Sequence, residues 1–432
     1  MAWDFETEPE FEEKLEWMRE FVRDEIIPLE ELNVSEEQMA EITKPMKAEV
    51  RRRGLWAAHL PPELGGGGFG QVKLGLMHEI LGQTGRAPSI FGNNAPDSGN
   101  AELLALGGTA EQKKKWMEPL LAGEMRSAYS MTEPHTAGSD PKLLKTRATR
   151  DGDDWVIEGH KWFTSNGSRA DFLITMAVTD TEVHPYSGSS MFIVPTDSPG
   201  LNIIRDVPVM SEPDHKTGEP GGHAEIIYDK CRIPFENVVG GEAGIGEGFV
   251  LAQKRLGPGR IHHAMRWLGV SKRAFDMLCE RAVSRFSHGS FLSEKQMVQD
   301  WIATSHAEMQ AARLLTLHAA WRMDQVGASN ARNEIAIIKF YGAKVLYNVI
   351  DRAIQVHGAL GFSTDMPLEL MYRRARSARL VDGADEVHKM TVARRILKNC
   401  APVEVPSEHR PTRRRMVEER FADFLDAEAV NS

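Results

Sequence analysis

Apolar residues recur at helical spacing along the first quarter of the chain. In FEEKLEWMREFVRDEIIPLE they fall three or four positions apart, which predicts a helix that ends near Pro28. A second periodic run, SEEQMAEITKPMKAEVRRRGLW, is interrupted at Pro45. Further helices are predicted in QVKLGLMHEILGQ and AEQKKKWMEPLLAGE. The pattern therefore predicts a helical N-terminal domain over residues 1–125.

Near residue 126 the helical period gives way to short runs rich in β-branched and aromatic residues. These runs are DDWVIEGHKWFTSNG, DFLITMAVT, SSMFIVPT, LNIIRDVPV and HAEIIYDKCRIP, and turn residues separate them. They predict a middle β domain over residues 126–240, which is a usual size for one domain.

Long helical periods return after GIGEGFVLAQ and predict a C-terminal helical domain over residues 241–400. Pro258, between two glycines in RLGPGR, is expected to break or kink the first of these helices. The remaining residues, 401–432, are predicted to form a tail with a basic run of three arginines (RRR) and one short amphipathic helix. The order of helices, strands and helices predicts an α+β fold with segregated elements, not alternating βαβ units.

One glycine-rich stretch, PPELGGGGFGQ, invites a nucleotide-binding interpretation. Its Gly65, Gly67 and Gly70 satisfy the dinucleotide pattern G-x-G-x-x-G. That motif should follow a buried apolar strand, and here it follows Pro61 and Pro62. The stretch is therefore predicted to be a loop before a helix.

Composition narrows the function classes. The formal net charge of -10 over 432 residues argues against nucleic acid as the main partner. Cys231, Cys279 and Cys400 have no metal-ligand spacing and indicate a reducing compartment. No segment is apolar enough over sufficient length to span a bilayer, and the acidic N-terminus lacks the pattern of a signal peptide. We expect a bacterial cytoplasmic protein or, as the second choice, one of the mitochondrial matrix.

Four separated segments carry a family resemblance: YSMTEPHTAGSD (129–140), KWFTSNG (161–167), IQVHGALGF (354–362) and RLVDGADEVH (379–388). In this order and spacing they resemble the acyl-CoA dehydrogenase family, over nearly the whole chain to about residue 400. LGPGRIHHAMRWLG and VDGADEVH resemble the long-chain branch that is elsewhere fused to a kinase-like domain.

The resemblance implies an N-terminal helical domain, a middle β-barrel-like domain and a C-terminal four-helix bundle. It implies FAD as the cofactor, no metal, and a homo-oligomer, either a dimer or a tetramer. The implied reaction is α,β-dehydrogenation of an acyl-CoA thioester to the trans-2-enoyl-CoA, with an electron-transfer flavoprotein as acceptor. Within the family, the branch leads us to expect long or bulky acyl chains.

By this resemblance Asp382 is the base that takes the α-proton. The segment reads Val-Asp-Gly-Ala where the common family form is Tyr-Glu-Gly-Thr, so the base is one methylene shorter. Asp385 is the alternative base. Without the resemblance, the stretch would read as a solvated acidic turn in which Asp385 or Glu386 caps the last helix.

The resemblance also assigns cofactor and substrate contacts. Phe163 would shield one flavin face, Ser165 would lie near the reactive flavin nitrogen, and Arg285 would reach the pyrophosphate of a neighbouring subunit's FAD through paired donors. The complete set of implied FAD contacts is Met131, Thr132, Phe163, Ser165, Arg285, Gln296, Gln355, His357, Gly358, Ala359, Ala384 and Glu386.

Ser139 and Arg260 are the candidate substrate-binding residues. His262 and His263 are interpreted as structural, because no HExxH or Cys/His cluster accompanies them. Two alternatives remain: a nitroalkane-oxidase-like flavoenzyme, which also uses an aspartate base, and a DNA-associated flavoprotein of the same superfamily. The sequence pI of about 5.9 argues against the second alternative.

Overall fold

The N-terminal third of the chain is helical in the computed structural model, which describes residues 6–219, 221–402 and 410–429. The chain divides into two units, residues 1–389 and 390–432. The first unit begins with α1 (Pro9–Phe21), α2 (Glu36–Arg52), α3 (Gln71–Leu81), α4 (Ala87–Ile90), α5 (Asp97–Gly107), α6 (Ala110–Gln112) and α7 (Glu118–Ala122).

Prolines affect these helices less than the sequence suggested. The chain after α1 stays helical in π and 3₁₀ form as far as Glu31, with Pro28 inside the 3₁₀ turn. Pro45 lies inside α2, which does not stop there. At the start of α2, Ser35 and Gln38 form a capping box that satisfies otherwise unpaired backbone donors.

The middle of the chain forms one mixed, seven-stranded sheet in the order β1-β4-β2-β3-β7-β6, with β5 paired to β4. The β1–β4 pair is parallel, whereas β3–β7, β4–β5 and β6–β7 are antiparallel. The strands are β1 (Ser127–Ser130), β2 (Arg147–Asp151), β3 (Asp154–Ser165), β4 (Phe172–Val178), β5 (Ser189–Pro195), β6 (Leu201–Asp206) and β7 (His223–Pro234).

The sheet is joined to the helices through β4, whose apolar residues are buried on both faces. Leu173 and Ala177 point into the core of the β domain. Phe172 and Ile174, on the opposite face, pack in a second core that includes Trp116 from the N-terminal helices. Because β4 serves both cores, the sheet packs directly against the N-terminal helices.

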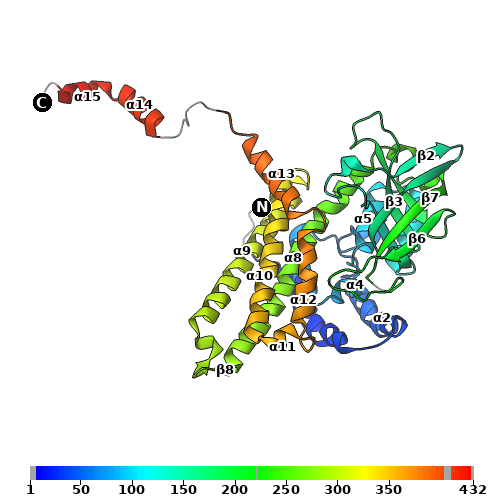
Figure 1. Cartoon of the computed structure of the whole chain (residues 1–432), viewed down its shortest axis with the longest axis horizontal. Coiled ribbons are helices and arrows are strands. Elements are labelled where there is room, and N and C mark those ends of the chain that lie inside the picture. Colours follow the sequence, from blue (N-terminus) through cyan, green and yellow to red (C-terminus); the bar gives the residue numbers. More distant parts are fainter. Residues whose placement is uncertain (1–5, 220, 403–409, 430–432) are drawn as a thin grey trace. The chain divides into compact units, whose positions relative to one another are not determined.

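Long helices build the rest of the first unit and lie side by side in Figure 1 around one shared core. Pro258 does not interrupt the first of them, so the break predicted there does not occur. The elements are α8 (Gly248–Ser284), β8 (Phe286–Ser287), β9 (Ser290–Phe291), α9 (Gln296–Val326), α10 (Arg332–His357), α11 (Ala359–Phe362), α12 (Leu368–Ala375), a 3₁₀ turn (Arg376–Arg379) and α13 (Asp385–Leu397).

The second unit holds the last residues of α13, then α14 (Arg410–Arg420) and α15 (Ala422–Ala429). In its described residues the tail contains two short helices where the sequence predicted one, and the RRR run belongs to α14. Part of the predicted tail, residues 403–409 and 430–432, lies outside the described residues.

The predicted order of a helical domain, a β domain and a helical region is confirmed. The glycine-rich loop is not a nucleotide site, because Asp324 of α9 occupies the start of the following helix. Its Oδ1 accepts from the backbone N–H of Gln71 at 2.7 Å, and its Oδ2 accepts from Val72 at 3.2 Å. Among the described residues, no helix has the length and apolar character needed to cross a membrane.

Candidate active site

The acidic junction between α12 and α13 has a strained backbone. Asp382 has φ +54° and Gly383 has φ +96°. A left-handed conformation is costly for an aspartate, and such strain concentrates at functional positions. Gly383 also lacks room for a side chain, since an added Cβ would lie 2.8 Å from Nε2 of His388. The sequence Asp-Gly therefore allows a turn that few other residue pairs could form.

Side chains from two helices hold this turn. The main-chain carbonyl oxygen of Asp382 accepts from Nε of Arg260 at 3.1 Å and lies 3.1 Å from Nε2 of His388. A carbonyl oxygen only accepts, so Nε2 of His388 must carry the hydrogen. The carboxylate oxygen Oδ2 of Asp382 lies 3.3 Å from Nε2 of His263.

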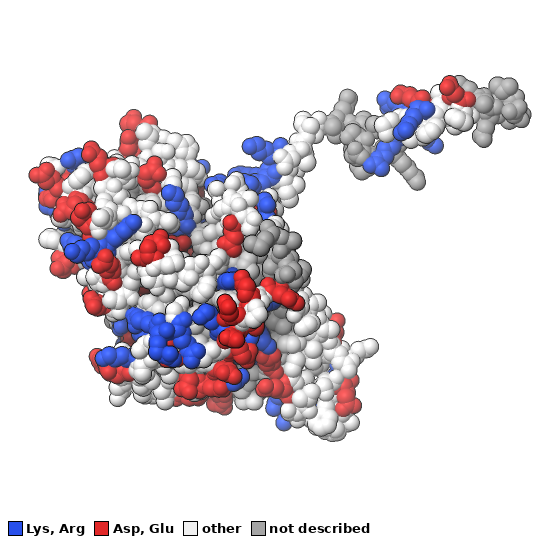
Figure 2. Space-filling model, turned by 180° about the vertical axis from the view of Figure 1, so that it is seen from behind, with Lys and Arg blue, Asp and Glu red and all other residues white. Residues whose placement is uncertain are grey.

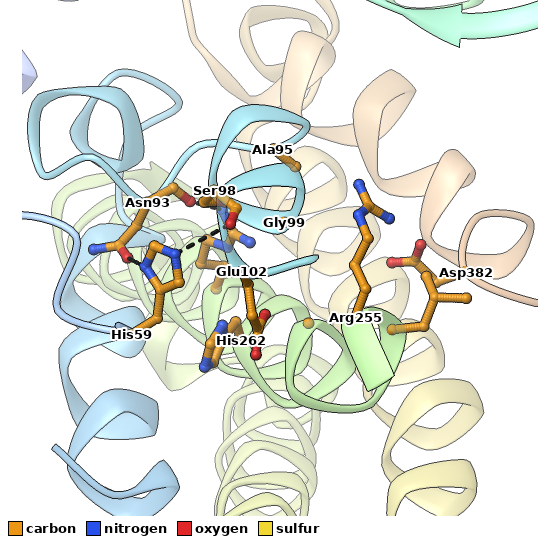
Figure 3. A pocket seen from close by; sticks show the side chains of 12 residues that line it. His59, Asn93, Ala95, Ser98, Gly99, Glu102, Arg255, His262 and Asp382 are labelled. Carbon is orange, nitrogen blue, oxygen red and sulfur yellow. Dashed lines mark hydrogen bonds between the residues drawn. The ribbon is translucent and has the colours of Figure 1, made fainter. Parts of the chain in front are cut away.

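Asp382 lines a cavity of about 50 Å³, which Figure 3 shows at close range. Most of its lining is polar and comes from the N-terminal helices and α8. His59, at the far side, is held by Asn93 at 2.8 Å and by the carbonyl of Ser98 at 3.1 Å. Arg255 lies beside Asp382 in the same view. The cavity thus presents hydrogen-bonding groups on several sides of one carboxylate.

Positive neighbours keep Asp382 ionised. Burial would raise the pKa of its carboxyl group, but the surrounding cations outweigh burial and hold that pKa below its ordinary value. The contributing groups are, in order, His263, Arg255, Arg260 and Lys339, of which His263 contributes only when it is protonated. At neutral pH the junction therefore offers a carboxylate that can accept a proton.

A second acidic side chain lines the cavity, and its pKa is shifted in the opposite direction. Burial raises the pKa of Glu102, on α5, to about 7, and Arg255 only partly offsets that effect. Burial likewise lowers the pKa of Arg266 to about 10. Two carboxyl groups whose environments move their pKa values apart are a common feature of sites that handle protons.

The alternative base, Asp385, does not share this position. Its side chain is buried and its Oδ2 accepts from Nε of Arg379 at 2.8 Å. It is the first residue of α13, preceded by the half-buried Ala384 and followed by the exposed Glu386. Between the two aspartates, the lining of the cavity includes only Asp382 among the described residues.

A second group of predicted residues meets at the ends of β1 and β3. Nζ of Lys161 donates to the carbonyl of Met131 at 2.8 Å, and the N–H of Trp162 donates to the carbonyl of Thr132 at 3.0 Å. The next residue, Phe163, has φ +50° and a side chain that is 41% exposed. An exposed aromatic ring on a strained backbone indicates a surface that a ligand covers.

Ser165 and Lys161 have partners that the sequence did not suggest. The Ser165 hydroxyl lies 2.9 Å from Nδ1 of His223, which begins β7. Nζ of Lys161 also lies 3.0 Å from Oε1 of Glu133, and both side chains are buried. The loop that carries Met131 and the strand that carries Phe163 are thereby fixed to each other.

Arg255 links this group to the cavity. Its guanidinium lies 4.1 Å above the ring of Tyr129 on β1, and the Tyr129 hydroxyl lies 3.7 Å from the sulfur of Met131. Arg255 also lines the cavity that contains Asp382. The two groups are therefore neighbouring parts of one site.

The remaining predicted cofactor residues lie elsewhere. Arg260 and Arg285 are on, and directly after, the continuous helix α8, and a rise of about 1.5 Å per residue places them roughly 40 Å apart. Gln296 and Gln355 are exposed, as are Gly358 and Ala359, whereas His357 is buried and its Nδ1 lies 2.8 Å from the carbonyl of Ala353. Within one chain these residues do not meet Asp382.

Figure 1 shows β8 and α11 toward the same end of the helical region, away from the sheet. Gly358, at the turn into α11, has φ +65° and open space where a Cβ would stand. Ser139 is exposed in the turn that follows Thr132. The predicted set thus divides into a site around Asp382 and Phe163 and an exposed group at the other end of α8.

Family models match three consecutive parts of this chain. They are the acyl-CoA dehydrogenase N-terminal domain over residues 8–124, the middle domain over 128–222 and the C-terminal domain over 246–397. The chain belongs to the acyl-CoA dehydrogenase family. The site around Asp382 is therefore interpreted in terms of the family's flavin-dependent oxidoreductase chemistry.

Individual relatives agree with this assignment. The probable acyl-CoA dehydrogenase FadE2 of Mycobacterium tuberculosis is 43% identical over 356 residues, covering 82% of this chain and 85% of FadE2. Acyl-CoA dehydrogenase family member 10 of Mus musculus is 39% identical over 405 residues, covering 91% of this chain but only 37% of that protein. This match supports the branch predicted from LGPGRIHHAMRWLG and VDGADEVH.

The fold has a solved counterpart. A Mycobacterium abscessus protein assigned to the acyl-CoA dehydrogenases superposes with a TM-score of 0.85 at 38% identity, covering 92% of this chain and 100% of that one. The chain spans less than two thirds of several curated relatives, as with the mouse protein. Among the described residues, no group of three or more His, Cys, Asp or Glu side chains could hold a metal ion.

The residues near Phe163 fit the flavin that the family implies. The exposed ring of Phe163 is a flat apolar surface, and the Ser165 hydroxyl next to it is oriented by His223. The carbonyls of Met131 and Thr132 are already occupied by Lys161 and Trp162, which leaves the shape of this loop fixed. A rigid aromatic surface beside preoriented polar groups suits a planar ring system.

Sequence reasoning missed several residues of the site. Lys161 was quoted within KWFTSNG but given no role, and His263 was interpreted only as structural. Glu102 lies in a stretch that carries no motif, and its one signal is a charged residue within the otherwise apolar run NAELLAL. Arg255 directly precedes LGPGRIHHAMRWLG but was given no role, and neither pattern reveals what the side chain faces.

Proposed function

We propose that this protein is an FAD-dependent acyl-CoA dehydrogenase that converts an acyl-CoA thioester to the trans-2-enoyl-CoA. The observation that carries the proposal is the ionised Asp382 carboxylate in a cavity that Arg255 links, through Tyr129, to the group around Met131 and Phe163. α,β-Dehydrogenation needs a base for the α-proton beside an acceptor for the β-hydride. FAD, when bound, supplies that acceptor.

Asp382 would take the α-proton. It is charged at neutral pH, its main chain is held by Arg260 and His388, and its carboxylate faces the cavity. General-base catalysis of this kind contributes typically about 10²–10⁴-fold in rate. The Asp385 carboxylate already accepts a hydrogen bond from Arg379, which makes Asp385 the weaker candidate for the base.

Met131, Thr132, Phe163 and Ser165 would hold the flavin ring, and Ala384 and Glu386 would lie along the cofactor near the start of α13. The exposed residues Arg285, Gln296, Gln355, Gly358 and Ala359, together with the buried His357, would serve the FAD of a neighbouring subunit. The distance of roughly 40 Å along α8 between Arg260 and Arg285 supports this division, because one cofactor could not contact both ends of the helix within a chain. The functional form would then be a homo-oligomer.

The acyl group is proposed to be long or bulky, and the electron acceptor is proposed to be an electron-transfer flavoprotein. The electron acceptor follows from the family resemblance, and the chain length follows from the branch within it. Ser139 and Arg260 remain the candidate substrate contacts. A cavity of about 50 Å³ is too small for a long acyl chain, so such a chain would have to extend past it.

The nitroalkane-oxidase-like alternative keeps one supporting observation, which is the aspartate in place of the usual glutamate. A DNA-associated flavoprotein would need a strongly basic face, whereas Figure 2 shows acidic side chains beside the basic ones on the face in view, and the net charge is -10.

A substrate panel separates these functions. The flavin-loaded protein is mixed anaerobically with acyl-CoAs of four to twenty carbons, with branched acyl-CoAs and with nitroethane, and loss of flavin absorbance is followed. We expect acyl-CoAs, and among them long or bulky ones, to bleach the flavin. Bleaching by nitroethane alone would establish the alternative, and best turnover on butyryl-CoA would remove the chain-length proposal.

A further inference from the structure

We propose that His263 is a positioning residue for the Asp382 carboxylate, and that its contact is matched to an aspartate base in place of a glutamate. This inference rests on the proposed function only in taking Asp382 as the base.

The main chain of Asp382 is fixed from two directions. Arg260, on α8, and His388, on α13, both reach its carbonyl oxygen at 3.1 Å. A third contact fixes the chain just before the junction, because Nζ of the buried Lys339 donates to the carbonyl of Ala378. With the backbone held, the side-chain torsions decide where the carboxylate points.

His263 is placed to set those torsions. It follows Arg260 by three positions on α8, so both side chains lie on one face of the helix. Nε of Arg260 donates to the main-chain carbonyl oxygen of Asp382, and Nε2 of His263 lies 3.3 Å from Oδ2 of the Asp382 side chain. One helical face therefore contacts both the main chain and the side chain of the base.

The protonation state suits this role. Burial, helped by the nearby Arg266, lowers the pKa of His263 to about 4, so the imidazole is neutral at pH 7. The ring nitrogen and the carboxylate oxygen lie 3.3 Å apart, and a carboxylate only accepts, so a hydrogen bond between them would require the hydrogen to be on Nε2. A neutral imidazole orients the carboxylate without adding the full charge that would weaken it as a base. The other groups around the pair are Arg255, Arg260, Lys339, His388, Glu102 and Tyr129.

The distance between His263 and Asp382 also limits how long the side chain of the base at position 382 can be. A glutamate at position 382 would add one carbon–carbon bond, about 1.5 Å, to the side chain. The present 3.3 Å separation has no room for that extension in the direction of His263. A glutamate base would have to turn away, unless the residue at position 263 were smaller.

The first experiment compares His263→Gln with His263→Leu. Glutamine keeps a donor at a similar reach, whereas leucine keeps volume without a donor. The readout is exchange of the substrate α-proton in D₂O under anaerobic conditions, together with FAD content and thermal midpoint. We expect exchange within about threefold of wild type for glutamine and a loss of roughly 10–100-fold for leucine, the scale of a misplaced reacting group. Met265→Leu, a buried core position on α8, is the matched control and should exchange at the wild-type rate.

The second experiment is a double-mutant cycle. We expect Asp382→Glu to lose roughly 30-fold in exchange and His263→Ala to lose roughly 10-fold, with the double variant no slower than Asp382→Glu alone. Nitrogen-15 NMR of the protein with labelled histidine gives a readout independent of turnover. It should show His263 as the neutral Nε2-protonated form at pH 7, and that signal should shift in Asp382→Asn.

The outcomes are distinct. Equal losses in the glutamine and leucine variants, wild-type exchange in the leucine variant, or additive losses in the cycle would each overturn the positioning role. A doubly protonated or Nδ1-protonated His263 would do the same. If the wild-type protein exchanges the α-proton of none of the acyl-CoAs, the proposed function itself fails. The NMR result would still test the contact between His263 and Asp382, because it does not depend on turnover.

Discussion

Removal of the Lys161 ammonium should destabilise the middle domain and loosen the flavin loop. In Lys161→Met, Glu133 remains as a buried carboxylate without its cation, since the two side chains are 0% and 4% exposed in the native protein. Breaking such a pair from one side costs about 3–5 kcal/mol. Glu133 keeps two backbone donors, Lys145 at 2.8 Å and Thr146 at 2.9 Å, so we expect the lower end, about 3 kcal/mol. The carbonyl of Met131 loses its donor at the same time.

The assay is urea unfolding followed by tryptophan fluorescence, with flavin release measured in parallel. Lys161→Met should unfold at lower urea and release FAD at lower urea than wild type. Lys161→Met with Glu133→Gln removes both charges and should recover more than half of the loss. The control is Arg232→Met on the same sheet, whose pair with Asp154 is 3.0 Å long but 48% and 37% exposed, and should cost at most about 1 kcal/mol. A Lys161→Met protein as stable as the Arg232→Met control, with full FAD retention, would refute this reasoning.

Three further predictions follow from the same contacts. Because the folded-state pKa of Glu102 is raised to about 7, protons bind the folded state more tightly between about pH 4.5 and 7, and stability falls as pH rises through that window. Glu102→Gln should therefore match wild type near pH 4.5 and exceed it at pH 8, by up to about 3 kcal/mol in urea unfolding; equal curves at pH 8 would contradict the burial argument. Arg285→Ala should weaken FAD retention and leave the folding of the monomer intact, as measured by flavin content after gel filtration, and unchanged flavin content would exclude the intersubunit role. Gly383→Ala should slow α-proton exchange at least roughly tenfold, because its φ is +96° and its Cβ would meet His388. Gly152→Ala, in the turn between β2 and β3, also has a positive φ (+64°) but open space for a Cβ, and should keep exchange unchanged; equal exchange rates in the two variants would show that the turn is not required.

The fold was predictable from the sequence because its signals are local. The helical period of the N-terminal quarter and the β-rich runs after residue 126 predicted the order of elements, and β4 explains why FLITMAV is apolar at nearly every position: both of its faces are covered. Of the break or kink predicted at Pro258, the break does not occur. A proline lacks one backbone donor, yet α8 continues through it within a well-packed core.

The candidate site was predictable only in part. Asp382, Phe163 and Ser165 were named through the family resemblance, and their roles stay predictions. His263, Glu102 and Lys161 could not be assigned, because their roles depend on long-range contacts: Lys161 meets a glutamate 28 positions earlier, and Asp382 meets a histidine 119 positions earlier. Spacing along the chain contains no record of such pairs. The strain at Asp382 was equally hidden, since a left-handed aspartate is a property of the folded junction.

The central claim is that Asp382 takes the α-proton, and stopped-flow reduction of the bound flavin tests it most directly. Asp382→Asn keeps almost the same shape but cannot accept a proton. The variant should retain FAD and bind acyl-CoA, yet reduce flavin at least about 10²–10⁴-fold more slowly than wild type. Asp385→Asn should be much milder, and Asp382→Glu should retain some activity. Reduction at the wild-type rate by Asp382→Asn, with loss of reduction in Asp385→Asn, would show that Asp385 is the base and that this account of the site is wrong.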